Sequence, residues 1–269
     1  MSDAVEVVVC GAAGRMGRML IGLTAEMPGF RLAGAIEATG HPSLGQDAGT
    51  LAGVRALGVP IQSDFAGLIR AAHVVIDFTT PAATLAHAEA AVAAGTGLVI
   101  GTTGLDPAED ERLRRLVART RTVMAANYSV GVTVLLELVA EATRLLGDGF
   151  DAEIVELHHH HKQDAPSGTA LAIGRAVATA REVDFASARV LAREGIVGAR
   201  QPGEIGIVGL RAGDAIGDHT VIFGGIGERI ELIHRAQSSD CLARGALRAA
   251  SWVASKPSGL YAMRDVLGL

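Results

Sequence analysis

The amino-acid sequence predicts an α/β protein with two parts: a Rossmann-like, doubly wound parallel sheet, and a second α+β domain with a mixed open sheet. In the first half, apolar runs alternate with glycine-rich turns and helical stretches, which is the pattern of βαβ units. These runs are nearly continuous in Val, Ile, Leu and Ala, as expected of parallel strands that helices cover on both faces. In the second half the strand-like runs alternate apolar and polar residues, which favours half-exposed strands.

Five strands are expected in the first domain, which we place at residues 1–127. We assign no element to the glycine-rich stretch 39–60, because a loop of that length is usually either functional or mobile. The expected strands are VEVVVC (5–10), FRLAGAI (30–36), HVVIDF (73–78), GLVIG (97–101) and TVMAAN (122–127).

The second domain is expected to span residues 128–237 and to open with a long amphipathic helix over 132–147 that stops at a glycine. The tail, 238–269, is expected to complete the first domain and to contain a helix over 240–256. Shorter strands should lie between the two helices, in the stretches DAEIVEL, ARVLAR, EIGIVGLRA, DHTVIFGG and RIELIHRA.

Length, charge and cysteine content limit the class of protein. The chain has 269 residues, of which 49% are hydrophobic, so it can build one large core or two moderate ones. Its net charge of −5 provides no basic field for nucleic acid or an anionic membrane. The N-terminus resembles neither a signal peptide nor a membrane span, and the two cysteines, Cys10 and Cys241, give no disulfide framework. We therefore expect a cytoplasmic protein.

A glycine-rich turn follows the first predicted strand. Gly11, Gly14 and Gly17 have the spacing G-x-x-G-x-x-G, with Ala13 where a dinucleotide-binding turn usually has its second glycine. Such a turn lets the backbone and the following helix N-terminus approach a pyrophosphate. Glu37 lies 20 residues beyond Gly17, where an acid that binds the adenosine ribose is expected. The alternative is an ordinary tight turn with an incidental glutamate.

Two further turns follow predicted strands, DFTTPAAT (77–84) and GTTGLDPAED (101–110). Ligands of open α/β sheets bind beyond the carboxyl ends of the strands, so these turns are candidate cofactor walls. Taken alone, they are more typical of helix N-caps and turns.

The stretch EIVELHHHHKQDAPSGTALAIG (153–174) contains four successive histidines. If 153–161 is a strand, neighbouring side chains point to opposite faces, so the four histidines cannot converge on one metal ion. Two histidines of one face with Glu156 could bind a metal, and surface or core histidines are a further alternative.

Acid–base chemistry is the interpretation that we favour for this stretch. Pro166 and Ser167 are expected to begin a helix, which places free backbone N–H groups close to Lys162. A lysine beside a helix N-terminus favours a carboxylate ligand, and a neighbouring histidine can exchange a proton near neutral pH.

Seven segments together resemble the 4-hydroxy-tetrahydrodipicolinate reductase (dihydrodipicolinate reductase) family over essentially the whole chain. They are GAAGRMGR, DFTTP, VIGTTG, AANYSVGV, ELHHHHKQDAPSGTA, RAGDAIGDHTV and GLYAMRDVLGL. The resemblance implies an NAD(P)H-dependent oxidoreductase that makes tetrahydrodipicolinate in diaminopimelate and lysine biosynthesis. It also implies a homotetramer built through the substrate-domain sheets, with a cyclic dicarboxylate as substrate and no metal.

The resemblance also implies roles for particular residues. His158 is the expected proton donor or acceptor and Lys162 the second catalytic group, while His159, Gly168 and Thr169 bind the dicarboxylate. Because cofactor and substrate must meet in one cleft, a hinge between the domains is expected. The implied cofactor contacts are Gly11, Ala12, Ala13, Gly14, Arg15, Met16, Glu37, Gly101, Thr102, Thr103, Ala125, Ala126, Asn127 and Tyr128.

One position departs from the family pattern. Many relatives carry an arginine after the ribose-binding acid, whereas this chain has Ala38, although Arg15 could contact a 2′-phosphate instead. We therefore expect NADH to serve at least as well as NADPH. Two other functions stay open at this point: another NAD(P)-dependent amino or keto acid dehydrogenase, and a nucleotide-sensing module without catalysis.

Overall fold

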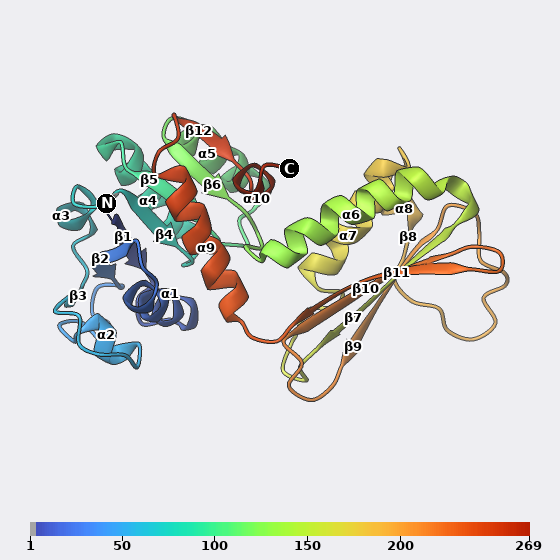
Figure 1. Cartoon of the computed structure of the whole chain (residues 1–269), viewed down its shortest axis with the longest axis horizontal. Helices are drawn as coiled ribbons and strands as arrows, with labels where there is room; N and C mark the ends of the chain where they lie inside the picture. The colour runs from blue at the N-terminus through green and yellow to red at the C-terminus, as the bar shows by residue number, and fades with distance from the viewer. Residues whose placement is uncertain (1–3) are drawn as a thin grey trace. The chain divides into compact units, whose positions relative to one another are not determined.

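The computed structural model describes residues 4–269, which form two compact units (Figure 1). One unit comprises the chain up to Ser129 together with Asp240–Leu269, and the other is Val130–Ser239. The chain thus leaves the first unit once and returns to it for its C-terminal segment.

The first unit is built on a seven-stranded sheet in which every strand pair is parallel. Its strands are β1 (Val5–Cys10), β2 (Phe30–Ile36), β3 (Ile61–Gln62), β4 (Val74–Asp77), β5 (Gly97–Ile100), β6 (Arg121–Met124) and β12 (Gly259–Tyr261). The spatial order is β12-β6-β5-β4-β1-β2-β3, so the chain winds outward from β1 in both directions. This arrangement confirms the predicted doubly wound sheet.

Helices cover both faces of this sheet, which explains its continuous apolar strands. On one face, α4 (Pro81–Ala94) and α5 (Pro107–Val117) share a core with Val8, Cys10 and Val75. Helices α1 (Arg15–Glu26) and α9 (Asp240–Val253) pack against each other and against the strands. The central strand residues Val7 to Val9 are wholly buried, as parallel strands between two helical layers require.

The stretch between β2 and β4 is more ordered than expected. It contains a short helix, α2 (Ala48–Leu51), then the strand β3 and a second short helix, α3 (Phe65–Ile69), none of which was predicted. Asp47 organises it, because its carboxylate accepts hydrogen bonds from the backbone N–H groups of Thr50, Leu57 and Gly58. These hydrogen bonds, that of Thr50 foremost, lower the pKa of Asp47 to about 2.

The C-terminal segment completes the first sheet. Strand β12 pairs in parallel with β6, and the short helix α10 (Met263–Leu267) that follows it is capped by Gly268 in the left-handed conformation. Helix α9 ends at Val253, three residues before the end expected from the sequence.

The second unit contains a five-stranded mixed sheet, as predicted. Its strands are β7 (Asp151–His158), β8 (Arg189–Val190), β9 (Ile205–Arg211), β10 (Gly217–Gly224) and β11 (Arg229–Ala236). In the order β11-β10-β7-β9-β8, the first three strands are antiparallel and the last three parallel. Only two residues of the expected strand ARVLAR are paired.

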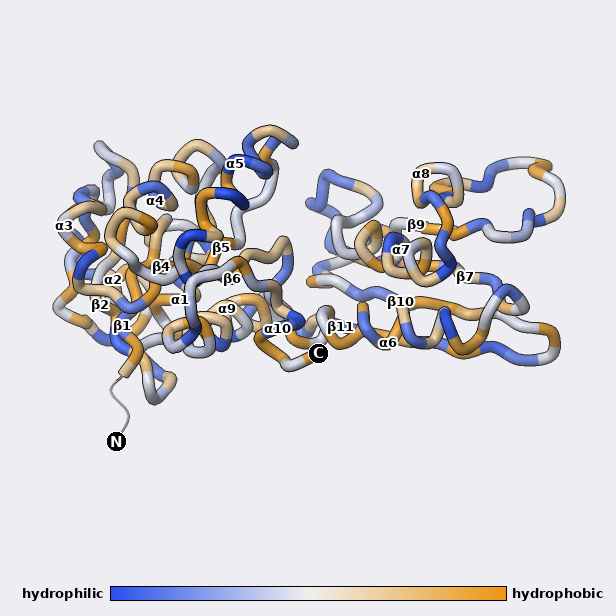
Figure 2. Tube along the Cα trace, turned by 90° about the horizontal axis from the view of Figure 1, so that it is seen from above, coloured by the Kyte–Doolittle hydropathy of each residue, from blue (hydrophilic) through white to orange (hydrophobic). Residues whose placement is uncertain are grey.

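Two long helices cover one face of this second sheet. Helix α6 (Val130–Leu146) is mostly hydrophobic with hydrophilic residues at intervals, as Figure 2 shows, and packs against α7 (Gly168–Ala180). Their apolar sides share a core with Ile154, Ile207 and Phe223 of the strands. Two short helical pieces, η1 (Gly147–Gly149) and α8 (Phe185–Ala188), join these elements.

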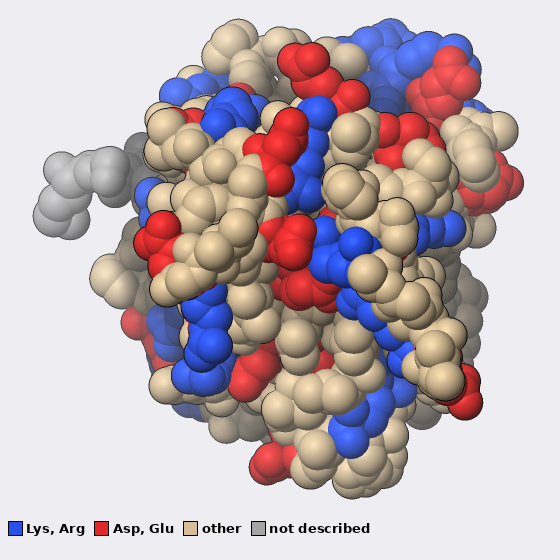
Figure 3. All heavy atoms as spheres, turned by 90° about the vertical axis from the view of Figure 1, so that its right-hand side faces the viewer, with Lys and Arg blue, Asp and Glu red and all other residues tan. Residues whose placement is uncertain are grey.

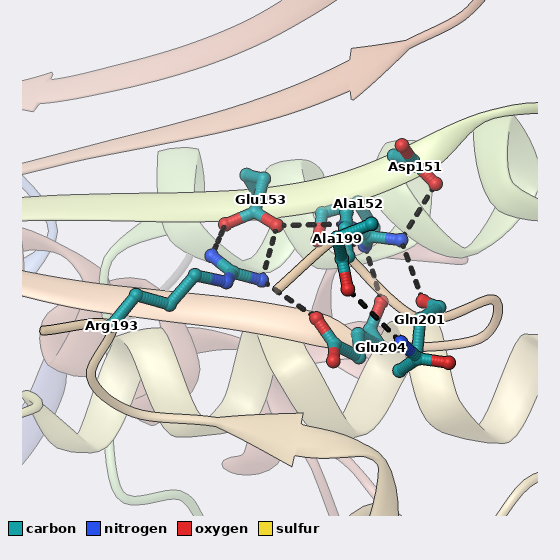
Figure 4. A network of polar contacts seen from close by, with 8 residues as sticks. Asp151, Ala152, Glu153, Arg193, Ala199, Gln201 and Glu204 are labelled. Atoms are coloured by element: carbon teal, nitrogen blue, oxygen red, sulfur yellow. Dashed lines mark hydrogen bonds and ion pairs between the residues drawn. The ribbon is translucent and has the colours of Figure 1, made fainter. Parts of the chain in front are cut away.

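Residues 191–204 form no helix or strand, yet ion pairs fix their course (Figure 4). Arg193 makes a two-pronged contact with Glu153 at 2.9 Å and also reaches Glu204 at 3.0 Å. Arg200 contacts Asp151 and Glu153 and donates to the carbonyl of Glu204. Such two-pronged arginine contacts restrict geometry more than single ion pairs do.

On the face viewed in Figure 3, Lys and Arg side chains are interspersed with Asp and Glu side chains. Among the described residues, no helix has both the length and the apolar character that crossing a bilayer demands.

Candidate active site

The glycine-rich turn of the first unit is closely packed against the start of α1. Gly11 has a positive φ of +69°, and a Cβ on Gly17 would lie only 2.0 Å from the Gly11 carbonyl oxygen. Gly17 therefore lets the helix begin directly on the turn. Gly14 is the N-cap of α1 and has no side-chain oxygen. The first backbone N–H groups of α1 therefore receive no hydrogen bond from a capping side chain at this position.

The predicted ribose-binding acid lies beside this turn. The carboxylate of Glu37 accepts hydrogen bonds from the backbone N–H of Ala13 at 3.0 Å and from that of Ala38 at 2.9 Å. A residue at the end of β2 is thus held against the turn that follows β1, as parallel neighbours in a sheet allow. This contact fixes Glu37 at the turn, and its role toward a ribose stays a prediction.

A buried carboxylate joins the two other turns of the first unit. Asp77 ends β4 with 1% exposure, and its Oδ1 accepts from the Thr79 and Thr84 hydroxyls at 2.6 and 3.2 Å. The Thr102 hydroxyl contacts that of Thr84 at 2.7 Å, and His87 Nδ1 contacts Asp77 Oδ2 at 2.7 Å. Thr102 is among the predicted cofactor contacts, whereas Asp77 was predicted only as part of the segment 77–84 and His87 was not predicted. An aspartate that ends an apolar strand and precedes two threonines was the available signal.

Two further candidate cofactor residues, Gly101 and Tyr128, are fixed by packing. A Cβ on Gly101 would lie 2.0 Å from the Phe78 ring, so this position accepts no side chain. Tyr128 is 1% exposed, and its hydroxyl lies 2.8 Å from the Ile100 carbonyl and 3.0 Å from that of Val123. Burial raises the pKa of Tyr128 well above its ordinary value. Its side chain thus joins the ends of β5 and β6, and only its backbone can offer contacts to a ligand.

His158 is the last residue of β7 and lies on the buried face of that strand. Its Nδ1 is 2.5 Å from Oε2 of Glu156, which has no exposed surface. An ionised carboxylate can only accept, so Nδ1 carries the hydrogen and Nε2 is the nitrogen that can exchange a proton. The ring of His219 packs edge-on against that of His158, with 5.3 Å between centroids.

The strand does not continue through the histidine tract, so the alternation considered for residues 153–161 is wrong beyond His158. A turn follows instead, in which the His159 N–H donates to the Ala215 carbonyl. His160 and His161 are exposed, and His160 Nδ1 contacts the Gly213 carbonyl at 2.9 Å. The turn forms because the backbone hydrogen bonds of this segment go to the loop that joins β9 to β10.

Lys162 lies on this turn and pairs with Asp164, with 2.8 Å between Nζ and Oδ1. The hydrogen bond from Lys162 lowers the pKa of the Asp164 carboxyl, although desolvation opposes this effect. Helix α7 begins at Gly168, two residues after the expected start, and Ser167 caps it by accepting from the Ala170 N–H. The candidate residue Gly168 has open space around its Cα.

Two charged or polar groups of this site were not predicted. Arg211, at the end of β9, donates to Glu156 at 2.8 Å. His219 is 4% exposed and contacts the Ser167 hydroxyl at 3.0 Å, and burial lowers the pKa of His219 to about 4. Both lie more than 50 residues from His158 in the chain, so no local pattern could place them there.

The metal alternative gains no support at the histidine tract. Among residues 4–269, His158 and Glu156 are hydrogen bonded to each other, while His160 turns to a backbone carbonyl. The described residues do bring Cys10, Asp77 and His87 together, with donor atoms within 4.8 Å of one another. There Asp77 and His87 are already hydrogen bonded to each other and burial raises the pKa of the Cys10 thiol, which disfavours the thiolate that a metal needs.

Family models and curated relatives match nearly the whole chain. The model described as dihydrodipicolinate reductase, N-terminus, matches residues 5–128, and the one described as dihydrodipicolinate reductase, C-terminus, matches 131–267. The 4-hydroxy-tetrahydrodipicolinate reductase of Anaeromyxobacter dehalogenans is 51% identical over 264 residues, covering 98% of each chain. That of Halorhodospira halophila is 51% identical over 261 residues, covering 97% of this chain and 98% of the relative.

Solved structures share the fold at lower identity. The dipicolinate-bound dihydrodipicolinate reductase from Paenisporosarcina sp. TG-14 has a TM-score of 0.76 at 22% identity, covering 96% of this chain and 97% of its own. An amine dehydrogenase from Mycobacterium smegmatis has a TM-score of 0.65 at 14% identity, covering 96% and 95%. At these identities the likeness concerns the fold alone.

Proposed function

The chain belongs to the dihydrodipicolinate reductase family, and we propose that His158 and Lys162 are its catalytic groups. Membership makes it an NAD(P)H-dependent oxidoreductase with 4-hydroxy-tetrahydrodipicolinate reductase activity, in lysine and diaminopimelate biosynthesis. The other dehydrogenase and the non-catalytic nucleotide sensor are thereby set aside. The first unit is inferred to bind the cofactor and the second to bind the substrate.

His158 is proposed to transfer the proton of the reaction. The hydroxyl group of the substrate must first leave as water, and the reduced nicotinamide, when bound, would supply a hydride to the conjugated ring that remains. The enamine carbon that results needs a proton, and the Nε2 of His158 is the donor. The observation that supports this role is the 2.5 Å contact between Nδ1 and the buried Glu156, since it fixes a hydrogen on Nδ1 and leaves Nε2 as the nitrogen that can exchange the proton.

Lys162 and the start of α7 are proposed to bind the carboxylates of the substrate. The ammonium group already pairs with one carboxylate, that of Asp164, which is 65% exposed and can yield its place to a ligand. Gly168 and Thr169 contribute backbone N–H groups of the first helical turn, and the helix dipole favours negative charge there. His159, whose carbonyl accepts a hydrogen bond from the Lys162 N–H, is proposed to add a polar side chain for the same ligand.

Cofactor binding is proposed for the three turns of the first unit. Gly11, Ala12, Ala13, Gly14, Arg15 and Met16 would face the pyrophosphate, and Glu37 the adenosine ribose. Gly101, Thr102, Thr103, Ala125, Ala126, Asn127 and Tyr128 would line the nicotinamide half. The Asp77 network supports this assignment, because it holds Thr79 and Thr102 of two different turns against one carboxylate.

NADH is expected to be used at least as well as NADPH. The Glu37 carboxylate lies at the turn and would repel a 2′-phosphate, while Ala38 offers no guanidinium to bind one. The test is a coupled assay in which dihydrodipicolinate synthase generates the substrate and NADH or NADPH oxidation is followed separately. A preference for NADPH above about tenfold in kcat/KM would contradict the expectation.

A double variant sharpens this test. Glu37→Gln with Ala38→Arg removes the repulsion and adds a guanidinium, so it should shift the NADPH/NADH ratio of kcat/KM by at least about tenfold toward NADPH. The matched control is Glu26→Gln, which changes the same charge at the far end of α1 and should leave the ratio unchanged. The same assay tests the activity itself: no oxidation of either cofactor with substrate present would contradict it.

The face of the second sheet opposite α6 and α7 is proposed to bind other copies of the chain, giving a homotetramer. By strand register, Val155, Leu157, Val208, Leu210 and Ile233 share this face. Val208, Leu210 and Ile233 are 40%, 48% and 45% exposed, although they lie in strands that pack a core on their other side. An apolar sheet face of this kind is typical of an interface, and a second copy supplies the same surface.

Charges on this face are expected to dissociate the oligomer. The variant Val208→Glu with Leu210→Glu places two carboxylates at its centre, and sedimentation velocity should show a smaller species than the wild type. Leu145→Glu is the control, since Leu145 is 77% exposed on α6, in the helical layer. An unchanged sedimentation coefficient for the double variant, or a monomeric wild type, would contradict the proposed interface.

A further inference from the structure

We propose that Glu156 and Arg211 act as a positioning pair, which fixes the tautomer of His158 and links it to the segment that carries Lys162. This inference deepens the proposed function and rests on His158 being the proton donor. Neither residue is proposed to touch the substrate.

Both carboxylate oxygens of Glu156 accept hydrogen bonds from neighbouring groups. It has no exposed surface and lies two residues before His158 on the same face of β7. Its Oε2 accepts from His158 Nδ1 at 2.5 Å and from Arg211 Nη1 at 2.8 Å, and its Oε1 accepts from the Ser167 N–H at 3.1 Å. A buried carboxylate is costly unless it is paired in this way. Burial disfavours its charge, yet the hydrogen bonds from Arg211, His158 and Ser167 keep the pKa of Glu156 below its usual value.

Two glycines on the neighbouring strands leave room for the side chains of Glu156 and His158. A Cβ on Gly209 of β9 would lie 2.7 Å from Glu156 Oε1. A Cβ on Gly217 of β10 would lie 3.0 Å from His158 Nε2, the nitrogen proposed to exchange the proton. Glycine at these two positions therefore keeps side chains away from the carboxylate and from the reacting face of the imidazole.

Arg211 connects the two catalytic groups. Its Nη1 contacts Glu156, and its Nη2 donates to the Asp164 carbonyl at 2.5 Å. The Asp164 carboxylate in turn pairs with Lys162. One rigid guanidinium thus bridges the carboxylate that holds His158 and the turn that holds Lys162, so the two groups keep a defined relation.

The charges around His158 set the expected pH dependence. Glu156 is negative, Arg211 is positive and Lys162 adds a positive charge on the following turn, whereas His219 is neutral at pH 7 because burial lowers its pKa to about 4. A neighbouring carboxylate favours the imidazolium form that donates the proton, and a neighbouring cation disfavours it. Removing Glu156 or Arg211 should therefore move the pH profile in opposite directions.

The test compares Glu156→Gln with Arg211→Gln in kcat measured across pH. Glu156→Gln should lower kcat by at least about tenfold with KM changed less, and should move the descending limb at high pH to lower pH by about one unit or more. Arg211→Gln should move that limb to higher pH. A structural role alone would lower activity in both variants without opposite shifts, and that result would overturn the proposal.

Two further measurements separate failure of the pair from failure of the proposed function. In a His158→Gln background, Glu156→Gln should add little further loss, because both changes remove the same proton transfer. If His158→Gln stays active, the proposed proton donor is wrong. If His158→Gln is inactive but Glu156→Gln keeps kcat and the pH limb of the wild type, only the positioning pair is wrong. Circular dichroism and thermal melting identify a variant that fails to fold. If Glu156→Gln fails to fold, Glu156→Asp replaces it in the test. Glu156→Asp keeps the charge and should keep the position of the descending limb of the pH profile.

Discussion

His158→Ala is expected to lower kcat by about 10²- to 10⁴-fold while changing KM much less. The imidazole is proposed to act in the step that protonates the substrate, so its loss should raise the barrier of that step rather than weaken binding. The carboxylates of the substrate would still find Lys162 and the start of α7. Steady-state kinetics in the coupled assay give both constants.

The control for this prediction is His160→Ala. His160 belongs to the same tract but is exposed, and its ring contacts a backbone carbonyl rather than the Glu156 carboxylate. Its replacement should leave kcat within about twofold, as for surface substitutions away from a site. Equal losses in both variants, or an unchanged kcat for His158→Ala, would remove His158 from the mechanism.

Gly17→Ala is expected to abolish tight binding of the cofactor and to destabilise the first unit. The added methyl would lie 2.0 Å from the Gly11 carbonyl oxygen and 2.8 Å from the Ala12 Cα. Both are backbone atoms, so α1 and the turn must move apart, and overpacking of this kind costs about 1–3 kcal/mol or more. We expect the Kd for NADH to rise at least about 100-fold, as measured by nucleotide fluorescence, and the Tm to fall.

Gly22→Ala is the matched control on the same helix. There the nearest atom to a new Cβ is Val54 Cγ1 at 3.8 Å, an ordinary contact. Alanine favours helix over glycine by up to about 1 kcal/mol, so this variant should bind NADH like the wild type and melt no lower. Wild-type NADH affinity in Gly17→Ala would show that the close approach of turn and helix is not needed for binding.

Several features of the molecule could be predicted from short stretches of sequence. The strands of the parallel sheet, the turn from Gly11 to Gly17 and the amphipathic α6 depend on residue types and spacings within about 20 residues. Periodicity and glycine placement act locally, so they are visible without any knowledge of the fold. The end of β7 was not visible in this way, because the histidines give no stop signal and the strand ends only where the backbone of residues 213–215 accepts its hydrogen bonds.

The sequence by itself determined the two sheet types, the glycine-rich turn, Glu37 and the segment that contains His158 and Lys162. Only the tertiary structure decided which distant groups surround them. The register that pairs His158 with Arg211 and Leu157 with Asp218 brings Arg211, Gly217 and His219 to the imidazole. Strand register depends on the packing of a whole sheet face and on long-range backbone pairing, and neither is written in any local pattern.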